Sequence, residues 1–245
     1  MALNLYEMNP QIYDDYVSTE LEKNNSYKVF ELIKNITDKK DSVEIIDFCC
    51  GTGIFPRTLL SKLNNLKYLG LDINKNFIEF AQEKLKDERF KFVYGNSVNF
   101  EIDRKFDIAL ATSSYHHIED TEKINFLKNI RSCLKEDGVL VIYEKFIESF
   151  SNKIEAIDSA EKFYLERIKY MINTEELNEN QLFALFNEQY LSAIRHEEYK
   201  VDLHHFKNDI ENSGLEIKEQ HKLWPKENLY HNDEIGDFMF IIVKK

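Results

Sequence analysis

The chain of 245 residues has few of the features that mark secreted or membrane proteins. It has only three cysteines, two of them adjacent, so a disulfide framework is not expected. No apolar run approaches the roughly 18 residues that cross a membrane, and the first residues, MALNLYEMNP, carry no basic and apolar signal pattern. The sequence therefore predicts a cytoplasmic protein with no membrane partner.

Positive charge is also scarce. The chain has 32 lysine and arginine residues against 44 aspartate and glutamate residues, which gives a formal net charge of −12. Because an acidic surface repels polyanions, and because no basic cluster exceeds a pair such as Lys39-Lys40, a nucleic-acid partner is not expected. Hydrophobic residues make up 43% of the chain, which is enough for a folded core.

Glycine is the third scarce residue, with only seven in the chain, yet two of them stand close together in VEIIDFCCGTGIF, residues 43–55. This placement indicates a backbone requirement at Gly51 and Gly53. A phosphate loop is excluded, since no lysine followed by serine or threonine comes after the glycines. The adjacent cysteines are poorly spaced for a metal or a disulfide. A dinucleotide fingerprint is disfavoured, since Pro56 stands where its third glycine would be.

Hydrophobic patterns around this stretch predict strands that alternate with helices. Strands are expected at 43–48, 67–73, 90–96, 106–114 and 138–146, and helices at 53–63, 74–87 and 122–135. Such alternation predicts βαβ units and a parallel sheet. The strands of that sheet end at a common edge, where ligands of open α/β sheets bind.

The remaining segments extend this fold. We expect N-terminal helices over 1–40, a helical cap over 149–200, and a last helix followed by two antiparallel strands over 201–245. The prediction is one domain over 1–245 with its cofactor-binding core at 41–148. Its fold class is a Rossmann-like, doubly wound α/β fold. The sheet has seven mostly parallel strands, and the cap is inserted between strands five and six.

Polar residues at the strand ends point to a nucleoside. Asp72 ends the second strand, 19 residues after Gly53, and a carboxylate there can accept hydrogen bonds from both hydroxyls of a ribose. Asn96 and Ser97 follow the third strand, within reach of an adenine edge. The predicted ligand is therefore a cofactor that contains a nucleoside.

These motifs resemble those of the class I S-adenosylmethionine-dependent methyltransferases. The segments IIDFCCGTG, YLGLDI, VYGNS and FDIALATSSYHHI correspond to that family's first four motifs. The resemblance covers roughly residues 40–147, and it implies S-adenosylmethionine as cofactor and S-adenosylhomocysteine as product. It places Asp47 at the amino-acid end of the cofactor, and Asn96 where the family more often has aspartate. The implied cofactor site comprises Asp47, Cys49, Gly51, Gly53, Asp72, Ile73, Asn96, Ser97 and Thr112.

Candidate catalytic residues follow the fourth strand in SSYHHIED, where this family places residues that face the acceptor. His116 and His117 titrate near neutrality and could take a proton. Since adjacent side chains cannot easily face one point, at most one of them is expected to be the base. Tyr115 is the third catalytic candidate, and no metal site is expected. The aromatic cap predicts a partly apolar acceptor pocket, and the acceptor-binding candidates are Tyr143, Glu144, Lys145, Tyr164, Phe186 and Tyr190.

A second resemblance leaves alternatives open. The layout is similar to that of the carboxy-S-adenosylmethionine synthases, which produce a modified cofactor. That family holds the added carboxylate with an arginine in the helix before the sixth strand, where this chain has His205. Other non-methylating chemistry of a cyclase or lyase kind, a non-catalytic S-adenosylmethionine-binding protein and a nicotinamide-dependent oxidoreductase also remain. The favoured hypothesis is a methyltransferase acting on a small molecule, and the sequence is compatible with a homodimer.

Overall fold

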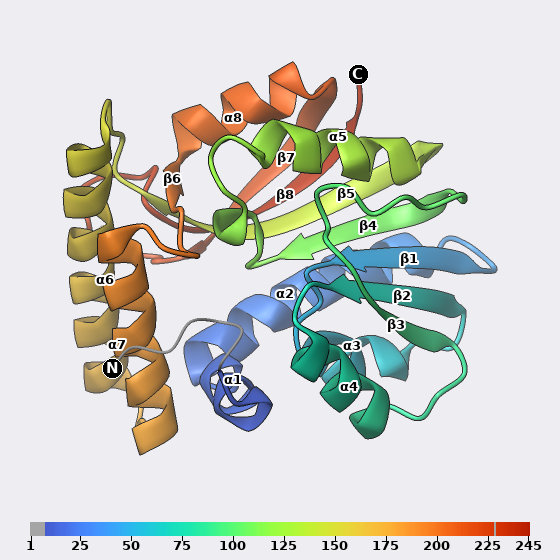
Figure 1. Ribbon diagram of the computed structural model, residues 1–245, viewed down its shortest axis with the longest axis horizontal. Helices are drawn as coiled ribbons and strands as arrows, with labels where there is room; N and C mark the ends of the chain where they lie inside the picture. Colours follow the sequence, from blue (N-terminus) through green and yellow to red (C-terminus); the bar gives the residue numbers. More distant parts are fainter. Residues whose placement is uncertain (1–7, 228) are drawn as a thin grey trace.

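The computed structural model describes residues 8–227 and 229–245 and shows an α/β fold built on one sheet (Figure 1). The strand order is β3-β2-β1-β4-β5-β8-β7, and the short β6 pairs with β5 beside this path. Pairing is parallel from β3 to β5, and β8 is antiparallel to both β5 and β7. The strands are β1 (Val43–Phe48), β2 (Leu66–Asp72), β3 (Phe90–Tyr94), β4 (Phe106–Thr112), β5 (Leu134–Ile147), β6 (Val201–Asp202), β7 (Leu215–Trp224) and β8 (Gly236–Lys244).

This arrangement confirms the Rossmann-like, mostly parallel fold expected from the sequence. Helices cover both faces of the sheet, so neither face of a strand such as β4 is exposed to water. This burial explains why the strand sequences are continuously apolar. The seven long strands correspond to the seven expected strands. The two-residue β6 is an addition that its sequence did not reveal.

Helices cover the two faces of the sheet. On one face, α2 (Glu20–Thr37) and α4 (Lys75–Lys84) pack on the strands through residues such as Val29 and Ile78, with α3 (Ile54–Thr58) and the 3₁₀ turn η1 (Leu60–Lys62) between them. On the other face, α5 (Lys123–Cys133) and α8 (Leu203–Asn212) bury Phe126, Phe206 and their neighbours. These layers leave the C-terminal edge of the parallel strands as the place for a site.

Two long helices lie at one end of the sheet, beyond the C-terminal end of β5 (Figure 1). They are α6 (Lys153–Thr174) and α7 (Glu179–Ile194), and α7 also packs on α1 (Pro10–Val17). Their shared core contains Phe163, Tyr164, Ile168 and Met171 from the apolar stripe of α6. None of the described helices is long and apolar enough to cross a membrane. Residues 1–7 of the expected N-terminal helical segment lie outside the described residues.

A buried ionic cluster joins α6 to the sheet. Nη1 of Arg167 donates to both carboxylate oxygens of Asp237 on β8, at 2.9 and 3.0 Å, and Nη2 donates to Oε1 of Glu22 on α2 at 2.6 Å. The hydroxyl of Tyr143 on β5 donates to Oε2 of Glu22 at 3.0 Å. Arg167 and Asp237 have no solvent exposure at all. The cluster therefore fixes the position of the cap relative to both the sheet and α2.

Candidate functional site

The loop after β1 has a left-handed backbone at three positions. Cys49, Gly51 and Gly53 have φ values of +61°, +57° and +68°. A β-carbon at Gly53 would lie 2.9 Å from Cε1 of Phe92 and 3.0 Å from the β-carbon of Ala81, so only glycine fits. The backbone requirement predicted for the glycine pair is confirmed. Cys49 adopts the same conformation with a side chain, and all three cysteines of the chain have free thiols.

Gly53→Ala is expected to lower the free energy of unfolding by about 2 kcal/mol, because the new β-carbon adds steric overlap to left-handed strain. Gly214→Ala is the matched control: Gly214 has φ +77°, but the nearest atoms to a β-carbon there belong to the flexible Arg131 side chain, at 3.2 Å or more. Urea unfolding should show a smaller loss for this control, about 1 kcal/mol. Equal losses would mean that overlap with Phe92 adds nothing.

Asp72 stands at the end of β2, beside this loop. Its Oδ2 accepts a hydrogen bond from the Gly51 N–H and its Oδ1 accepts one from the Asn74 N–H, both at 2.8 Å. The side chain is buried, and this burial raises the pKa of Asp72 although the two N–H donors act in the opposite direction. Asp72 is thus a carboxylate held in a fixed orientation next to the glycine loop.

A cavity of about 560 Å³ lies at this edge of the sheet. The ends of β1, β2 and β3 all contribute to its walls, so the fold brings together residues that are far apart in the sequence. Within the wall, Oδ1 of Asn96 accepts a hydrogen bond from the Val98 N–H at 2.9 Å. This side-chain oxygen therefore already stabilises the turn that contains Asn96. The expected cofactor residues that line the cavity are Cys49, Gly51, Asp72, Ile73, Asn96 and Ser97.

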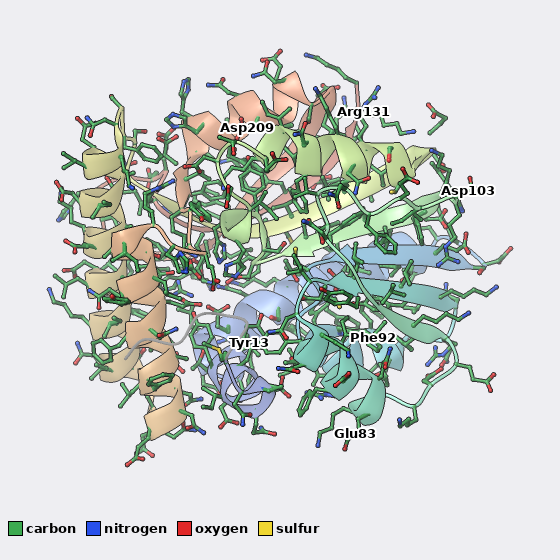
Figure 2. The ribbon with its side chains drawn as sticks, in the orientation of Figure 1. Tyr13, Glu83, Phe92, Asp103, Arg131 and Asp209 are labelled. Atoms are coloured by element: carbon green, nitrogen blue, oxygen red, sulfur yellow. The ribbon has the colours of Figure 1, made fainter. Side chains whose placement is uncertain are left out.

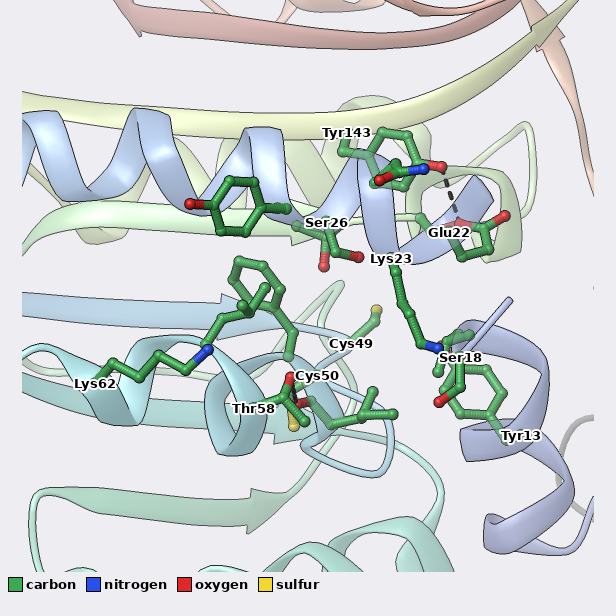
Figure 3. Close-up of a pocket in the computed structure, with 18 residues that line it drawn as sticks. Tyr13, Ser18, Glu22, Lys23, Ser26, Cys49, Cys50, Thr58, Lys62 and Tyr143 are labelled. Atoms are coloured by element: carbon green, nitrogen blue, oxygen red, sulfur yellow. Dashed lines mark hydrogen bonds between the residues drawn. The ribbon is translucent and has the colours of Figure 1, made fainter. Parts of the chain in front are cut away.

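Tyr13 on α1, labelled in Figures 2 and 3, is a wall residue that the sequence analysis missed. A β-carbon at Gly51 would lie 3.4 Å from Cε1 of Tyr13, so this ring covers the glycine loop. Asp14 holds α1 in this place, because it accepts hydrogen bonds from Oγ1 of Thr52 at 2.5 Å and from Arg57. The first helix therefore acts as a cover over the loop.

A second cavity, of about 430 Å³, lies between α2 and α3 (Figure 3). Tyr13 and Cys49 are wall residues of both this cavity and the first one, so the two cavities meet at the glycine loop. Its inner end is formed by Thr112, which was expected at the cofactor, and by Tyr143. Apolar residues of α3 and of the segment after it, such as Phe55 and Leu59, line the part farther from the sheet.

Asp47 lies behind the loop and is not a wall residue of either cavity. Its Oδ2 accepts a hydrogen bond from the hydroxyl of Tyr68 at 2.7 Å, whereas its buried Oδ1 has no partner among the described residues. Burial raises the pKa of Asp47 to about 7, against the effect of the Tyr68 hydrogen bond. Its role at the amino-acid end of a cofactor stays a prediction.

The two histidines of the 3₁₀ turn η2 (Tyr115–His117) have different surroundings. His116 is buried, with Nδ1 2.5 Å from Oε1 of Glu144, whereas His117 is half-buried and lines the 560 Å³ cavity. Both rings nevertheless approach Glu198, at 3.6 Å from His116 Nε2 and 3.5 Å from His117 Nδ1. The expectation that adjacent side chains could not face one point is wrong, because this tight turn brings their ring centroids to 4.0 Å.

Tyr115 points away from the cavities. It is fully buried, and its hydroxyl donates to Oδ2 of Asp209 on α8 at 2.5 Å. Tyr115 therefore lines none of these cavities, and its catalytic role stays a prediction. Glu144 is also fully buried behind His116 and lines none of these cavities, so its contact with an acceptor likewise stays a prediction.

A third cavity, of only about 20 Å³, lies where the cap meets the core. Its walls include Lys145, whose Nζ donates to Oγ of Ser113 at 2.6 Å. Its walls also include the polar or charged side chains of Glu22, Glu188, Glu198, His117 and Tyr16, beside apolar residues such as Val17 and Leu191.

The aromatic residues assigned to the acceptor pocket lie elsewhere. Phe186 and Tyr190 are each 52% exposed on the outer side of α7, and Tyr164 is buried in the core of the cap. None of the three lines any of these cavities. The expectation of an apolar acceptor pocket formed by these residues is therefore wrong, because α6 and α7 use their aromatic side chains for packing or expose them.

Comparison with known proteins identifies relatives of the core. A family model described as "Methyltransferase domain" matches residues 46–140. The chain is 29% identical over 147 residues to the demethylmenaquinone methyltransferase of Thermotoga maritima. The aligned region covers 58% of this chain and 61% of the relative. It is also 29% identical over 139 residues to the carboxy-S-adenosyl-L-methionine synthase of Nautilia profundicola, covering 56% of this chain and 58% of that one. The chain thus spans about three fifths of the length of these relatives.

The fold has counterparts among solved structures. The crystal structure of an S-adenosylmethionine-dependent methyltransferase from Clostridium acetobutylicum has a TM-score of 0.62 and 14% sequence identity to this chain. The match covers 98% of this chain and 99% of that one. The likeness of fold therefore extends to the N-terminal helices and the cap, beyond the residues matched by the family model.

Proposed function

Because the chain belongs to the class I S-adenosylmethionine-dependent methyltransferase superfamily, we propose that it binds S-adenosylmethionine and methylates a small molecule. Asp72 carries this proposal: it is a buried carboxylate beside a left-handed glycine loop, in the wall of a cavity of about 560 Å³. That volume lies within the range of pockets that hold small ligands and cofactors.

The residues in the cavity fit this cofactor. Asp72 would accept hydrogen bonds from the ribose hydroxyls, and Ile73, which is 38% exposed in the cavity wall, would pack on the adenine ring. Asn96 and Ser97 would face the edge of the base. Thr112 and Ser113 at the end of β4 would lie at the reacting end, since Ser113 is a wall residue of all three cavities.

When bound, the cofactor supplies an activated methyl group on a sulfonium, with a neutral thioether as leaving group. The protein then has to align the acceptor and exclude water. Lys145 and Ser113 present polar groups at this point, and His117 is a wall residue of the same small cavity and of the 560 Å³ cavity. Of the two candidate bases, only His117 is in position to contact an acceptor, because His116 is enclosed by Glu144 and Glu198.

The acceptor we propose is polar at the atom that is methylated. The small cavity beside Ser113 has charged walls, whereas the cavity between α2 and α3 offers apolar surface from Phe55 and Leu59. A molecule with a polar reacting end and a less polar body suits both. The Thermotoga maritima relative, which is named for demethylmenaquinone, gives one example of a small-molecule acceptor.

Nothing in the site favours carboxy-S-adenosylmethionine synthesis over methyl transfer. His205, at the position of that family's arginine, has Nδ1 2.8 Å from Oδ2 of Asp202 and stacks on Phe150 with the ring centroids 4.7 Å apart. Its position on α8 is therefore already tied to local partners. Because the Nautilia profundicola relative is named as a synthase of this kind, the test below includes that reaction as a possible outcome.

The test is binding of nucleoside cofactors by the purified full chain, followed by product formation. Calorimetry should give a dissociation constant for S-adenosylmethionine within about 1 μM–1 mM, the usual range for enzyme substrates, and no heat with NADH. Incubation with a panel of phenols, amines and carboxylic acids should then release S-adenosylhomocysteine. Binding of NADH in place of S-adenosylmethionine would overturn the proposal. Carboxy-S-adenosylmethionine in extracts of the protein would replace methyl transfer by the synthase reaction.

A further inference from the structure

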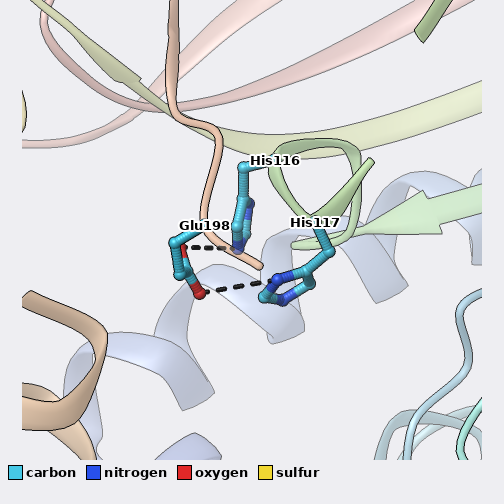
Figure 4. Close-up of side chains that lie close together, drawn as sticks. All are labelled: His116, His117 and Glu198. Atoms are coloured by element: carbon cyan, nitrogen blue, oxygen red, sulfur yellow. Dashed lines mark ion pairs between the residues drawn. The ribbon is translucent and has the colours of Figure 1, made fainter. Parts of the chain in front are cut away.

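Three potential metal ligands meet beside the cavities (Figure 4). His116 and His117 come from η2, and Glu198 comes from the segment between α7 and β6. One nitrogen of each ring and one oxygen of the carboxylate lie within 4.8 Å of one another. Two imidazoles and one carboxylate, with a position left open, form a donor set that proteins use for catalytic zinc.

Both histidine rings have an acceptor at Nδ1, as metal-binding histidines do. His116 Nδ1 lies 2.5 Å from Oε1 of Glu144, and His117 Nδ1 lies 2.8 Å from the carbonyl oxygen of Glu197. Donation of a proton from Nδ1 to each acceptor leaves the lone pair on Nε2. In His116 this is the nitrogen that approaches Glu198, whereas in His117 the nitrogen nearest to Glu198 is Nδ1 itself. Metal-binding histidines almost always have such a partner, which fixes the ring and makes it a better ligand.

Glu198 lacks the hydrogen bonds that a buried carboxylate normally receives. It is only 1% exposed, and neither oxygen accepts a well-formed hydrogen bond among the described residues. Lys200 Nζ lies 3.0 Å from Oε2, so this ammonium balances part of the charge at one oxygen. The other oxygen, Oε1, faces His117 at 3.5 Å and remains available as a ligand. A buried acceptor in this condition indicates a missing partner.

The charge of the surrounding cluster also favours a cation. Within the described part of the chain, contacts connect the three ligands with further ionic groups around the small cavity. The carboxylates are Glu22, Glu144, Glu188, Glu198 and Asp237, and the cations are Lys145, Arg167 and Lys200. Lys123, which is buried and donates to the carbonyl oxygens of Tyr115 and Ile118 beside the two histidines, adds a fourth cation. Five carboxylates against four cations leave a formal excess of one negative charge when the imidazoles are neutral. Buried charge without a counter-ion is costly, so a bound cation would be stabilised by this excess.

We propose that His116, His117 and Glu198 bind a divalent metal ion of the Zn²⁺ type. His117 and Glu198 line the small cavity at the cap, so the open coordination position faces the space assigned to the acceptor. The site itself does not depend on the proposed function. If both hold, the ion would attract an oxygen of the acceptor, and His117 would act as a ligand instead of as a free base.

The experiment uses the full chain, stripped with EDTA and dialysed, then titrated with Zn²⁺ or Co²⁺. Elemental analysis after dialysis should find one zinc ion per chain, and Co²⁺ should give the visible absorption of a four- or five-coordinate site. Glu198→Gln keeps the shape of the side chain and should weaken metal affinity by at least about tenfold, as should His117→Gln. His205→Gln is the matched control, because it removes another carboxylate-paired histidine, on α8, and should bind metal as the unaltered chain does.

Circular dichroism checks that each variant is folded. If Glu198→Gln is not, the half-buried His117→Gln carries the test. The proposal is wrong if the stripped chain takes up no stoichiometric metal, or if both variants bind metal as tightly as the control. Calorimetry with S-adenosylmethionine on the same samples separates this result from the proposed function, since the cofactor can bind whether or not metal does.

Discussion

Replacing Arg167 with methionine should lower the free energy of unfolding by about 3–5 kcal/mol, because the change leaves buried Asp237 without its ion-pair partner and leaves Glu22 with Lys145 alone. Arg167 is fully buried and donates to Asp237 and to Glu22. Burial raises the pKa of Glu22, but the charges of Lys145 and Arg167 outweigh this effect and lower the pKa to about 2. Glu22 is therefore ionised at neutral pH, and removal of Arg167 takes away one of the two cations that balance its buried charge.

Lys169→Met on the same helix is the matched control. Lys169 pairs with Glu166 at 2.7 Å, but the two side chains are exposed, so we expect a loss of about 0.5 kcal/mol or less. Denaturant unfolding of both variants measures the difference. Adding Glu22→Gln to Arg167→Met should recover part of the lost stability, since one buried charge is then gone. Similar small losses in both lysine and arginine variants would show that the buried cluster does not hold the cap to the core.

The strands and the cofactor loop could be predicted because their signals are local. The segment VEIIDF forms β1 with the expected bounds, since a buried parallel strand needs a continuous apolar run and ends where Gly51 and Gly53 turn the chain. Asp72 could be assigned because a strand end fixes which edge of the sheet a residue reaches. These predictions require knowledge only of where a strand ends and in which direction it runs. They do not require knowledge of how one helix packs on another.

The acceptor side could not be predicted in the same way, because it depends on which face of a helix or turn points inward. The helix α7 has apolar residues on most of its sides, so its sequence does not reveal that Phe186 and Tyr190 face solvent. Tyr115 precedes the histidines directly, yet the 3₁₀ turn directs it to Asp209 on α8. Glu198 reaches the histidines only through the path of the chain after α7.

The position of α1 over the glycine loop could not be predicted from the sequence either. Tyr13 lies on the first described helix, and its role over Gly51 depends on the contacts of Asp14 with Thr52 and Arg57. Periodicity alone identifies α1 as a helix and says nothing of this contact. Because α1 also packs on α7, the cover over the cofactor loop and the cap form one continuous layer above the sheet edge. A ligand would have to enter beside this layer or displace it.

Asp72→Ala should weaken the affinity for S-adenosylmethionine about 100-fold, since the change removes a charged acceptor of two ribose hydrogen bonds. The carboxylate also holds the Gly51 N–H at 2.8 Å, so part of the effect would come from a looser loop. Asp72→Asn separates the two causes, because its amide oxygen can still accept from Gly51 but the second acceptor and the charge are lost. Its amide nitrogen cannot accept the bond from the Asn74 N–H, so we expect a loss of about 1 kcal/mol in stability and at least tenfold weaker cofactor binding.

Asp87→Ala supplies the control for removal of a carboxylate outside the site. Asp87 precedes β3 and pairs with Arg89 at the surface, away from the residues that line the cavities. Calorimetry should give the same affinity for this variant as for the unaltered chain. If Asp72→Ala also retained that affinity, Asp72 would not contact the ribose, and its place beside Gly51 would have only a structural purpose. If Asp72→Asn alone retained it, the loop and not the ribose would account for the loss in Asp72→Ala.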